Sequence, residues 1–167
     1  LHSVILTLAL CLSTFSVQGQ GQCCGGSCAF GGTQFPGGTF STSGATFVTV
    51  STCIVAGEFQ LYNVGAGTQY EWSYCTGDGA ANGAGQVRQL TLFNNATTAQ
   101  ICYSDDFCGL LPKIQWTATF TGVVRVLSNQ FNCATNTTCH TLVWRSVGSA
   151  VPNDDCATAI PVSCGSS

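Results

Sequence analysis

Charged side chains are scarce in this sequence, at 7% of its 167 residues. Only 4 Lys+Arg face 7 Asp+Glu, so no basic surface can form that would neutralise a nucleic-acid backbone. The low charge does not indicate disorder, because a disordered chain combines high net charge with low hydrophobicity, whereas 45% of these residues are hydrophobic. We therefore expect no nucleic-acid partner, and a folded domain whose surface consists of uncharged polar residues and glycine.

Long apolar runs are missing after the N-terminal region, so the sequence predicts no membrane span. The apolar run at residues 4–12 is too short to cross a bilayer but has the length of a signal-peptide core. The small residues Val17 and Gly19 then stand where a signal peptidase requires them. We expect residues 1–19 to be a cleaved signal peptide and the mature protein to be secreted, either extracellular or at the cell surface.

Cysteine, in contrast, is abundant: the chain has 12, which indicates an oxidising compartment. From the spacing of six of them we expect three disulfide bonds: Cys53–Cys75, Cys102–Cys108 and Cys133–Cys139. The last two pairs have five residues between the cysteines, short enough for each bond to close one loop. In the first pair, Cys75 would lie near Cys53 across a hairpin.

The remaining cysteines of the mature chain are odd in number: Cys23, Cys24, Cys28, Cys156 and Cys164. At least one of them is expected to stay free, to bond to another chain, or to bond to a stretch that this sequence does not contain. Zinc is not expected at the first three, because no second ligand pair or histidine lies near them.

The sequence from residue 46 onwards has the alternating pattern of β-strands. Apolar and polar residues alternate strictly over 114–120, and Tyr70, Trp72 and Tyr74 alternate with polar neighbours. Glycine-containing turns at 65–67 and at Gly122 predict two tight hairpins. About eight short strands predict an all-β fold, an antiparallel, disulfide-stapled β-sandwich of jelly-roll type.

The domain organisation that follows has four parts. Residues 1–19 are the signal peptide, 20–45 an extended Cys/Gly-rich segment, 46–147 the β-sandwich, and 148–167 a linker or the start of a following module.

Three stretches resemble a repeat module of large secreted surface proteins of Bacteroidota-type bacteria: GEFQLYNVGAGTQYEWSYC (57–75), RQLTLFNNATTAQICYSDDFCGLLPKIQWTATFTGVVRVLSNQFNC (88–133) and TLVWR (141–145). That module is similar to the pre-peptidase C-terminal β-sandwich family, a jelly roll appended to many secreted proteins. The resemblance implies a surface location and a scaffold, since such modules have no established catalytic residues. The stretch NDDCATAIPVSCGSS (153–167) resembles the opening of a further module of this kind.

Few residues suggest chemistry. Asp105 and Asp106, with Asp78, are candidate calcium ligands, although the more ordinary interpretation places Asp105 in an Asx-type turn that closes the 102–108 loop. His140 is the one histidine of the mature chain, and we expect it at the surface where a strand begins rather than in a catalytic site. Apart from calcium the sequence predicts no cofactor, and it predicts no enzyme activity.

Three functions remain open. The chain is expected to be a structural or adhesive module that assembles with copies of itself or with neighbouring tandem modules. The alternatives are a glycan-binding module and a non-catalytic appendage of a larger secreted hydrolase. The aromatic stripe Tyr70, Trp72 and Tyr74 is expected to be core rather than a sugar-stacking platform, because the opposite face of that strand is polar. In the assembly hypothesis, residues 29–40 would add as a strand to the edge of a neighbouring sandwich.

Overall fold

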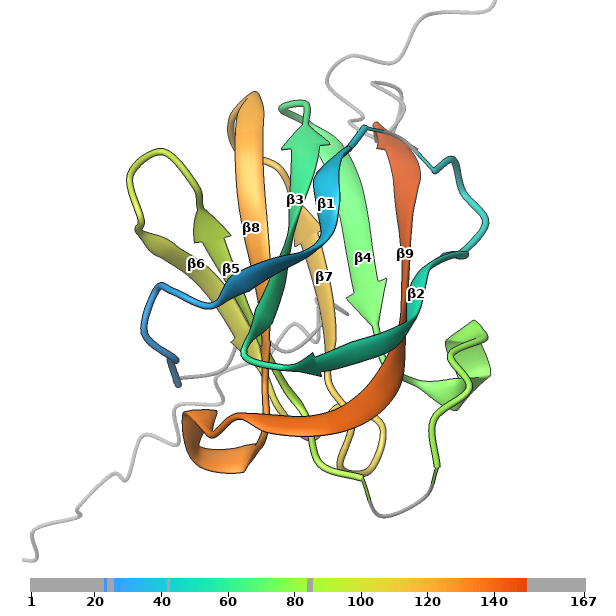
Figure 1. Ribbon diagram of the computed structural model, residues 1–167. Helices are drawn as coiled ribbons and strands as arrows, with labels where there is room; N and C mark the ends of the chain where they lie inside the picture. Colours follow the sequence, from blue (N-terminus) through green and yellow to red (C-terminus); the bar gives the residue numbers. More distant parts are fainter. Residues whose placement is uncertain (1–22, 24–25, 42, 84–85, 150–167) are drawn as a thin grey trace, which may run out of the picture.

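The computed structural model describes residues 23, 26–41, 43–83 and 86–149, and it shows two β-sheets packed face to face (Figure 1). Sheet A contains, in spatial order, β1 (Thr33–Phe40), β3 (Glu58–Val64), β8 (Gly122–Asn129), β5 (Gln89–Asn94) and β6 (Gln100–Ser104). Sheet B contains β2 (Val48–Ala56), β9 (Asn136–Ser149), β4 (Thr68–Ser73) and β7 (Lys113–Thr117). All pairings between these strands are antiparallel except that of β1 with β3, so the predicted all-β sandwich is confirmed.

Two short 3-10 helices, η1 (Thr76–Asp78) and η2 (Phe131–Cys133), follow β4 and β8. Within the described part of the chain, no helix combines the length and the hydropathy of a membrane span.

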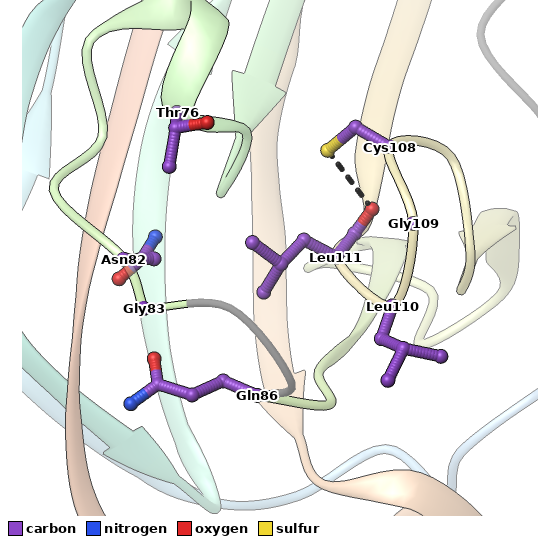
Figure 2. A pocket seen from close by; sticks show the side chains of 8 residues that line it. All are labelled: Thr76, Asn82, Gly83, Gln86, Cys108, Gly109, Leu110 and Leu111. Carbon is purple, nitrogen blue, oxygen red and sulfur yellow. Dashed lines mark hydrogen bonds between the residues drawn. The ribbon is translucent and has the colours of Figure 1, made fainter.

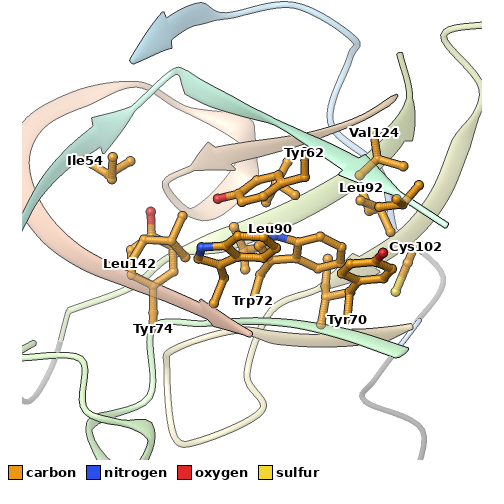
Figure 3. Packing of buried hydrophobic residues seen from close by; sticks show 14 of the residues in the cluster. Ile54, Tyr62, Tyr70, Trp72, Tyr74, Leu90, Leu92, Cys102, Val124 and Leu142 are labelled. Atoms are coloured by element: carbon orange, nitrogen blue, oxygen red, sulfur yellow. The ribbon is translucent and has the colours of Figure 1, made fainter. Parts of the chain in front are cut away.

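The main core lies between the sheets, and aromatic rings fill its centre (Figure 3). Tyr62 from sheet A packs against Trp72 and Trp144 from sheet B, with ring centroids 5.3 and 4.7 Å apart. Tyr70 and Tyr74 are buried beside Trp72. The alternating aromatic stripe of β4 is therefore core, as predicted.

Both predicted hairpins are wrong, because each turn crosses from one sheet to the other. The turn at 65–67 joins β3 of sheet A to β4 of sheet B, and the turn before Gly122 joins β7 of sheet B to β8 of sheet A. In each case the two strands bury their apolar faces against each other across the core. An alternating pattern identifies the buried face of a strand but not the layer that its neighbour occupies.

A segment before β1 crosses the outer face of sheet A, and we call residues 23–32, of which the structure describes Cys23 and 26–32, the strap (Figure 1). At β6 the Gln100 side chain donates a hydrogen bond of 2.6 Å to the Gly26 carbonyl. At β5 the ring of Phe30 meets Phe93 edge-on at 5.3 Å. The strap thereby covers a second, smaller apolar cluster that includes Phe59, Phe93, Tyr103 and Leu127.

One cation fastens the middle of the strap. The Arg125 guanidinium of β8 lies between the rings of Phe30 and Phe59, 3.9 and 3.7 Å from their centroids. It also donates to the Gly31 carbonyl at 3.0 Å and to the Asn95 side chain at 3.1 Å. Burial lowers the pKa of Arg125, but stacking on two aromatic faces compensates for lost hydration.

The strap continues into β1, which pairs in parallel with β3. Residues 33–40 are thus extended, as expected, but they complete the edge of their own sheet, so the sandwich begins before residue 46. Phe40 reaches the main core and stacks on Tyr62 with ring centroids 5.2 Å apart. Phe35, on the same strand, is exposed.

Four disulfide bonds hold the described residues together: Cys23–Cys102, Cys28–Cys133, Cys53–Cys139 and Cys75–Cys108. The six cysteines predicted to be bonded are bonded, but all three expected pairings, Cys53–Cys75, Cys102–Cys108 and Cys133–Cys139, are wrong. None of the four bonds closes a short loop, since their sequence separations run from 33 to 105 residues.

The sheets explain two of the pairings. Strand β2 lies antiparallel to β9 with Ile54 opposite His140, and the pairing is irregular on both sides of this pair. Cys53 and Cys139 flank it on the two strands, close enough to bond diagonally across them. Cys75 follows β4, whose neighbour is β7, so the loop leading into β7 brings Cys108 to it. The expected Cys53–Cys75 bond required the hairpin of β3 with β4, which does not form.

The strap accounts for the other two pairings. Cys23 and Cys28, expected to be terminal or intermolecular, bond within the chain to Cys102 of β6 and Cys133 of η2. The remaining cysteines, Cys24, Cys156 and Cys164, lie outside the described residues, as do the predicted signal peptide at 1–19 and the segment 150–167.

Candidate functional site

One hollow lies at one end of the sandwich, between the loop after η1 and the loop that leads into β7 (Figure 2). Its volume is about 520 Å³, and Leu110 and Leu111 form one wall. The opposite wall includes Asn82, whose amide group donates to the carbonyls of Tyr74 and Thr141 and accepts from the Thr141 N–H. Asn82 therefore holds the loops in place and has no acid–base role.

A second hollow, of about 330 Å³, follows the free edge of β7. The half-buried ring of Trp116 lines it. The other lining residues are Cys23 of the strap and four neutral polar residues, Gln69, Gln115, Thr117 and Thr119. Trp116 is partly buried and packs against the main core. An aromatic ring surrounded by amides and hydroxyls matches the surface of a neutral sugar.

A third, small hollow of about 160 Å³ lies beside the start of β9, and His140 lines it. The prediction that His140 is a surface residue is wrong, because it is 3% exposed. Its Nδ1 lies 2.6 Å from Nη2 of Arg88, which is also buried. Burial and the charge of Arg88 lower the pKa of His140. Sequence reasoning missed Arg88, which stands just before β5 in a polar stretch with no pattern of its own.

The outer face of sheet B carries an ion-pair cluster around one buried carboxylate. Glu71 accepts two hydrogen bonds from Arg145, of 3.1 and 3.0 Å, and lies 3.1 Å from Nζ of Lys113. Lys113 also pairs with Asp78 at 3.1 Å, and both cations lie over the ring of Phe47. The cluster joins β4, β7 and β9, and it leaves neither cation available for a polyanionic partner.

The three predicted calcium ligands do not meet. Asp78 pairs with Lys113 on the outer face of sheet B, whereas Asp105 and Asp106 follow β6 of sheet A. Burial and the neighbouring Asp105 raise the pKa of Asp106. Across the described residues, no group of three or more His, Cys, Asp or Glu side chains is placed to hold a metal ion.

The alternative role for Asp105 also differs from expectation. Its Oδ2 accepts hydrogen bonds from Gln89 at 3.0 Å and from the Tyr103 hydroxyl at 3.4 Å, rather than from backbone N–H groups of the loop. Burial and Asp105 together raise the pKa of Tyr103 to about 12. The carboxylate therefore joins the loop to β5 and β6.

A family model described as "Domain of unknown function (DUF8695)" matches residues 48–149. The chain belongs to this family. The DUF8695 match begins with the first residue of β2 and ends with the last residue of β9, so the strap and β1 precede it. All residues that line the three hollows described above lie within the matched range, with the exception of Cys23.

Comparison with curated proteins gives no match. Among solved structures, the chain is similar to the pre-peptidase C-terminal domain of collagenase from Bacillus anthracis, with 13% sequence identity and a TM-score of 0.42. The match covers 66% of this chain and 96% of that one. At this level it supports no conclusion about activity or ligand. The resemblance to Bacteroidota-type repeat modules has no counterpart in these comparisons and stays a prediction.

Proposed function

We propose that this chain is a secreted, non-catalytic structural subunit whose copies assemble into an extracellular fibre or surface appendage by exchanging the strap. The observation that carries this proposal is that the strap and β1 lie outside the family-matched residues, whereas the groups that hold them lie inside. The groups that hold the strap and β1 (Cys102, Cys133, Gln100, Arg125 and strand β3) belong to the family-matched residues 48–149. The strap and β1 precede that range.

Exchange between copies would preserve each of these contacts. The strap of one copy would cross sheet A of the next, and its β1 would add to the edge of the next β3. Cys23 and Cys28 would then bond to Cys102 and Cys133 of the neighbouring copy. Because such a head-to-tail contact need not close on itself, repeating it produces a fibre.

The oxidising conditions that the proposal requires agree with the four disulfides.

The test is to refold the reduced protein under oxidising conditions at low and at high concentration, followed by light scattering and non-reducing electrophoresis. We expect a covalent ladder that grows with concentration and collapses on reduction. The double variant Cys23→Ser/Cys28→Ser should abolish the ladder, whereas the matched control Cys75→Ser/Cys108→Ser should retain it. A wild-type protein that is monomeric at every concentration would show that the strap closes only its own sandwich, as in a tandem array.

A second function is favoured by one specific observation, the hollow at the edge of β7. Trp116 lies there among Gln69, Gln115, Thr117 and Thr119, with no charged side chain among the lining residues. As the second candidate function, we propose that this hollow binds neutral glycans. Glycan-array binding that is lost in Trp116→Ala but kept in Phe131→Ala, a change at an exposed aromatic of η2, would support it. Equal binding by both variants would exclude this hollow.

A further inference from the structure

Arg88 and His140 form a buried pair that neither proposed function uses. Arg88 is 0% exposed and stands at the entrance to β5. Its Nη2 contacts Nδ1 of His140 at 2.6 Å and donates to the carbonyl oxygens of Thr138 and, at 3.5 Å, Ile54. Tyr74 packs edge-on against the imidazole with ring centroids 6.0 Å apart, so the ring is held from two sides.

The contact with Arg88 determines where the imidazole carries its hydrogen. Nδ1 of His140 lies 2.6 Å from Nη2 of Arg88 and 3.3 Å from the Thr138 carbonyl oxygen, so Arg88 is its closer partner. Because a guanidinium can only donate, Nδ1 accepts and the hydrogen of the neutral ring sits on Nε2. Burial together with the charge of Arg88 lowers the pKa of His140, which keeps the ring neutral at physiological pH. The resulting Nε2–H donor has no hydrogen-bond partner within the described part of the molecule.

The positive charge of Arg88 is not matched by a carboxylate. Among the described residues, the ion pairs are those of Lys113 and Arg145 on the far sheet. Glu58 influences Arg88 electrostatically, but its Oε2 accepts the Val55 N–H instead of pairing with the guanidinium. Nε and Nη1 of Arg88 have no partner among the described residues either. A buried, unpaired cation is costly, and an anion nearby relieves that cost.

The third hollow gives a ligand access to this pair. Its lining residues are Gln86, Val87, Gln130, Asn136, Thr138 and His140, none of which carries a carboxylate. Asn136 donates to Oε1 of Gln130 at 2.8 Å, which leaves the amide nitrogen of Gln130 to serve as a further donor. The hollow thus combines the amide of Gln130, the fixed N–H of His140 and a cation behind the ring, and its volume of about 160 Å³ suits a small group.

We propose that this hollow binds a small carboxylate, with Nε2–H of His140 donating to one carboxylate oxygen and Arg88 stabilising the negative charge from behind the ring. Outside a cell such a group comes from acidic sugars or from acidic peptides. The site lies within the family-matched residues, and none of the residues that line it belongs to the strap.

The test follows the imidazole of His140 by long-range proton–nitrogen NMR at neutral pH, with His140→Gln to assign its signals. Sodium acetate should shift the Nε2 signal to saturation, whereas acetamide, its neutral isostere, should not. Glucuronate and N-acetylaspartate then distinguish the sugar from the peptide source. Saturation by sulfate but not by acetate would overturn the carboxylate assignment, and no saturable shift with any anion would overturn the site.

Two arginine variants separate the role of Arg88 from general charge. Arg88→Met should weaken acetate binding by about tenfold or more, which corresponds to about 1.4 kcal/mol, because it removes both the charge behind the ring and the donor to Nδ1 that keeps the hydrogen on Nε2. Arg145→Met removes a cation from the outer face of sheet B and should leave binding unchanged. Equal weakening in both variants would overturn the specific role of Arg88, and if Arg88→Met does not fold, the wild-type titrations with acetate, acetamide and sulfate decide the proposal.

Discussion

At the scale of single residues, the molecule uses its few charges internally. All 4 Lys+Arg of the chain are described, and each contacts specific groups of the fold. Arg125 fastens the strap, Arg145 and Lys113 surround Glu71, and Arg88 lies buried beside His140. Composition predicts no nucleic-acid partner, but it could not show that these cations hold the sheets together.

Arg125 gives the first prediction. Arg125→Met should destabilise the protein by about 1–2 kcal/mol, because it loses a guanidinium stacked between two rings. Amide hydrogen exchange in residues 26–32 should accelerate more than exchange in sheet B. Arg125→Lys, which keeps the charge but not the planar group, should fall between the wild type and Met. If all three proteins exchange alike, Arg125 does not hold the strap.

His140 gives a prediction about pH. Because burial and Arg88 lower its pKa in the folded state from the ordinary 6.5, the unfolded chain takes up a proton at higher pH than the folded chain does. Stability is therefore complete above the unfolded pKa and is lost as the pH falls through the lowered one. The urea midpoint should be higher at about pH 7.5 than at about pH 5.5, and His140→Gln should reduce that difference. An unchanged difference in the variant would contradict this assignment.

At the scale of elements, the alternating pattern of the sequence correctly predicted buried strand faces, but not which strands lie side by side. The stripe Tyr70, Trp72 and Tyr74 was correctly placed in the core, because alternation reports directly on burial. The two hairpins were not, because a short glycine turn can close a hairpin or change sheets. The disulfide pairings failed for the same reason: they were inferred from neighbours along the chain, whereas the sheets bring together cysteines 33 to 105 residues apart.

The junction of strap and β1 gives the third prediction. Gly32 has a φ of 88°, and an added Cβ would lie 2.6 Å from the Gly57 carbonyl oxygen and 2.8 Å from Leu127. Gly38 has a similar φ of 92° but nothing within 4 Å. Both Gly→Ala changes place an L-residue in the left-handed region, which costs about 1–2 kcal/mol of stability. Any additional loss of stability in Gly32→Ala therefore measures the close approach of the strap to the sheet. Chemical denaturation should show Gly32→Ala to be the less stable, and equal stability would contradict this packing.

At the scale of the whole molecule, two of the four disulfides tie the strap to the sandwich across sequence separations of 79 and 105 residues. In the chain-entropy account, closing loops this long stabilises by about 4–5 kcal/mol each. The candidate site was largely hidden from the sequence, since Arg88 and His140 are 52 residues apart and meet only when β5 and β9 fold. The fold class, in contrast, followed from alternation and cysteine content.

The central claim is that the strap is bonded to the sandwich, and disulfide mapping tests it most directly. The four Lys+Arg positions give trypsin too few cuts to separate Cys23 from Cys75, so the oxidised protein is digested with thermolysin or pepsin without reduction and analysed by mass spectrometry. We predict peptides that join Cys23 to Cys102 and Cys28 to Cys133, together with Cys53–Cys139 and Cys75–Cys108. Peptides that join Cys102 to Cys108, or Cys133 to Cys139, would contradict it.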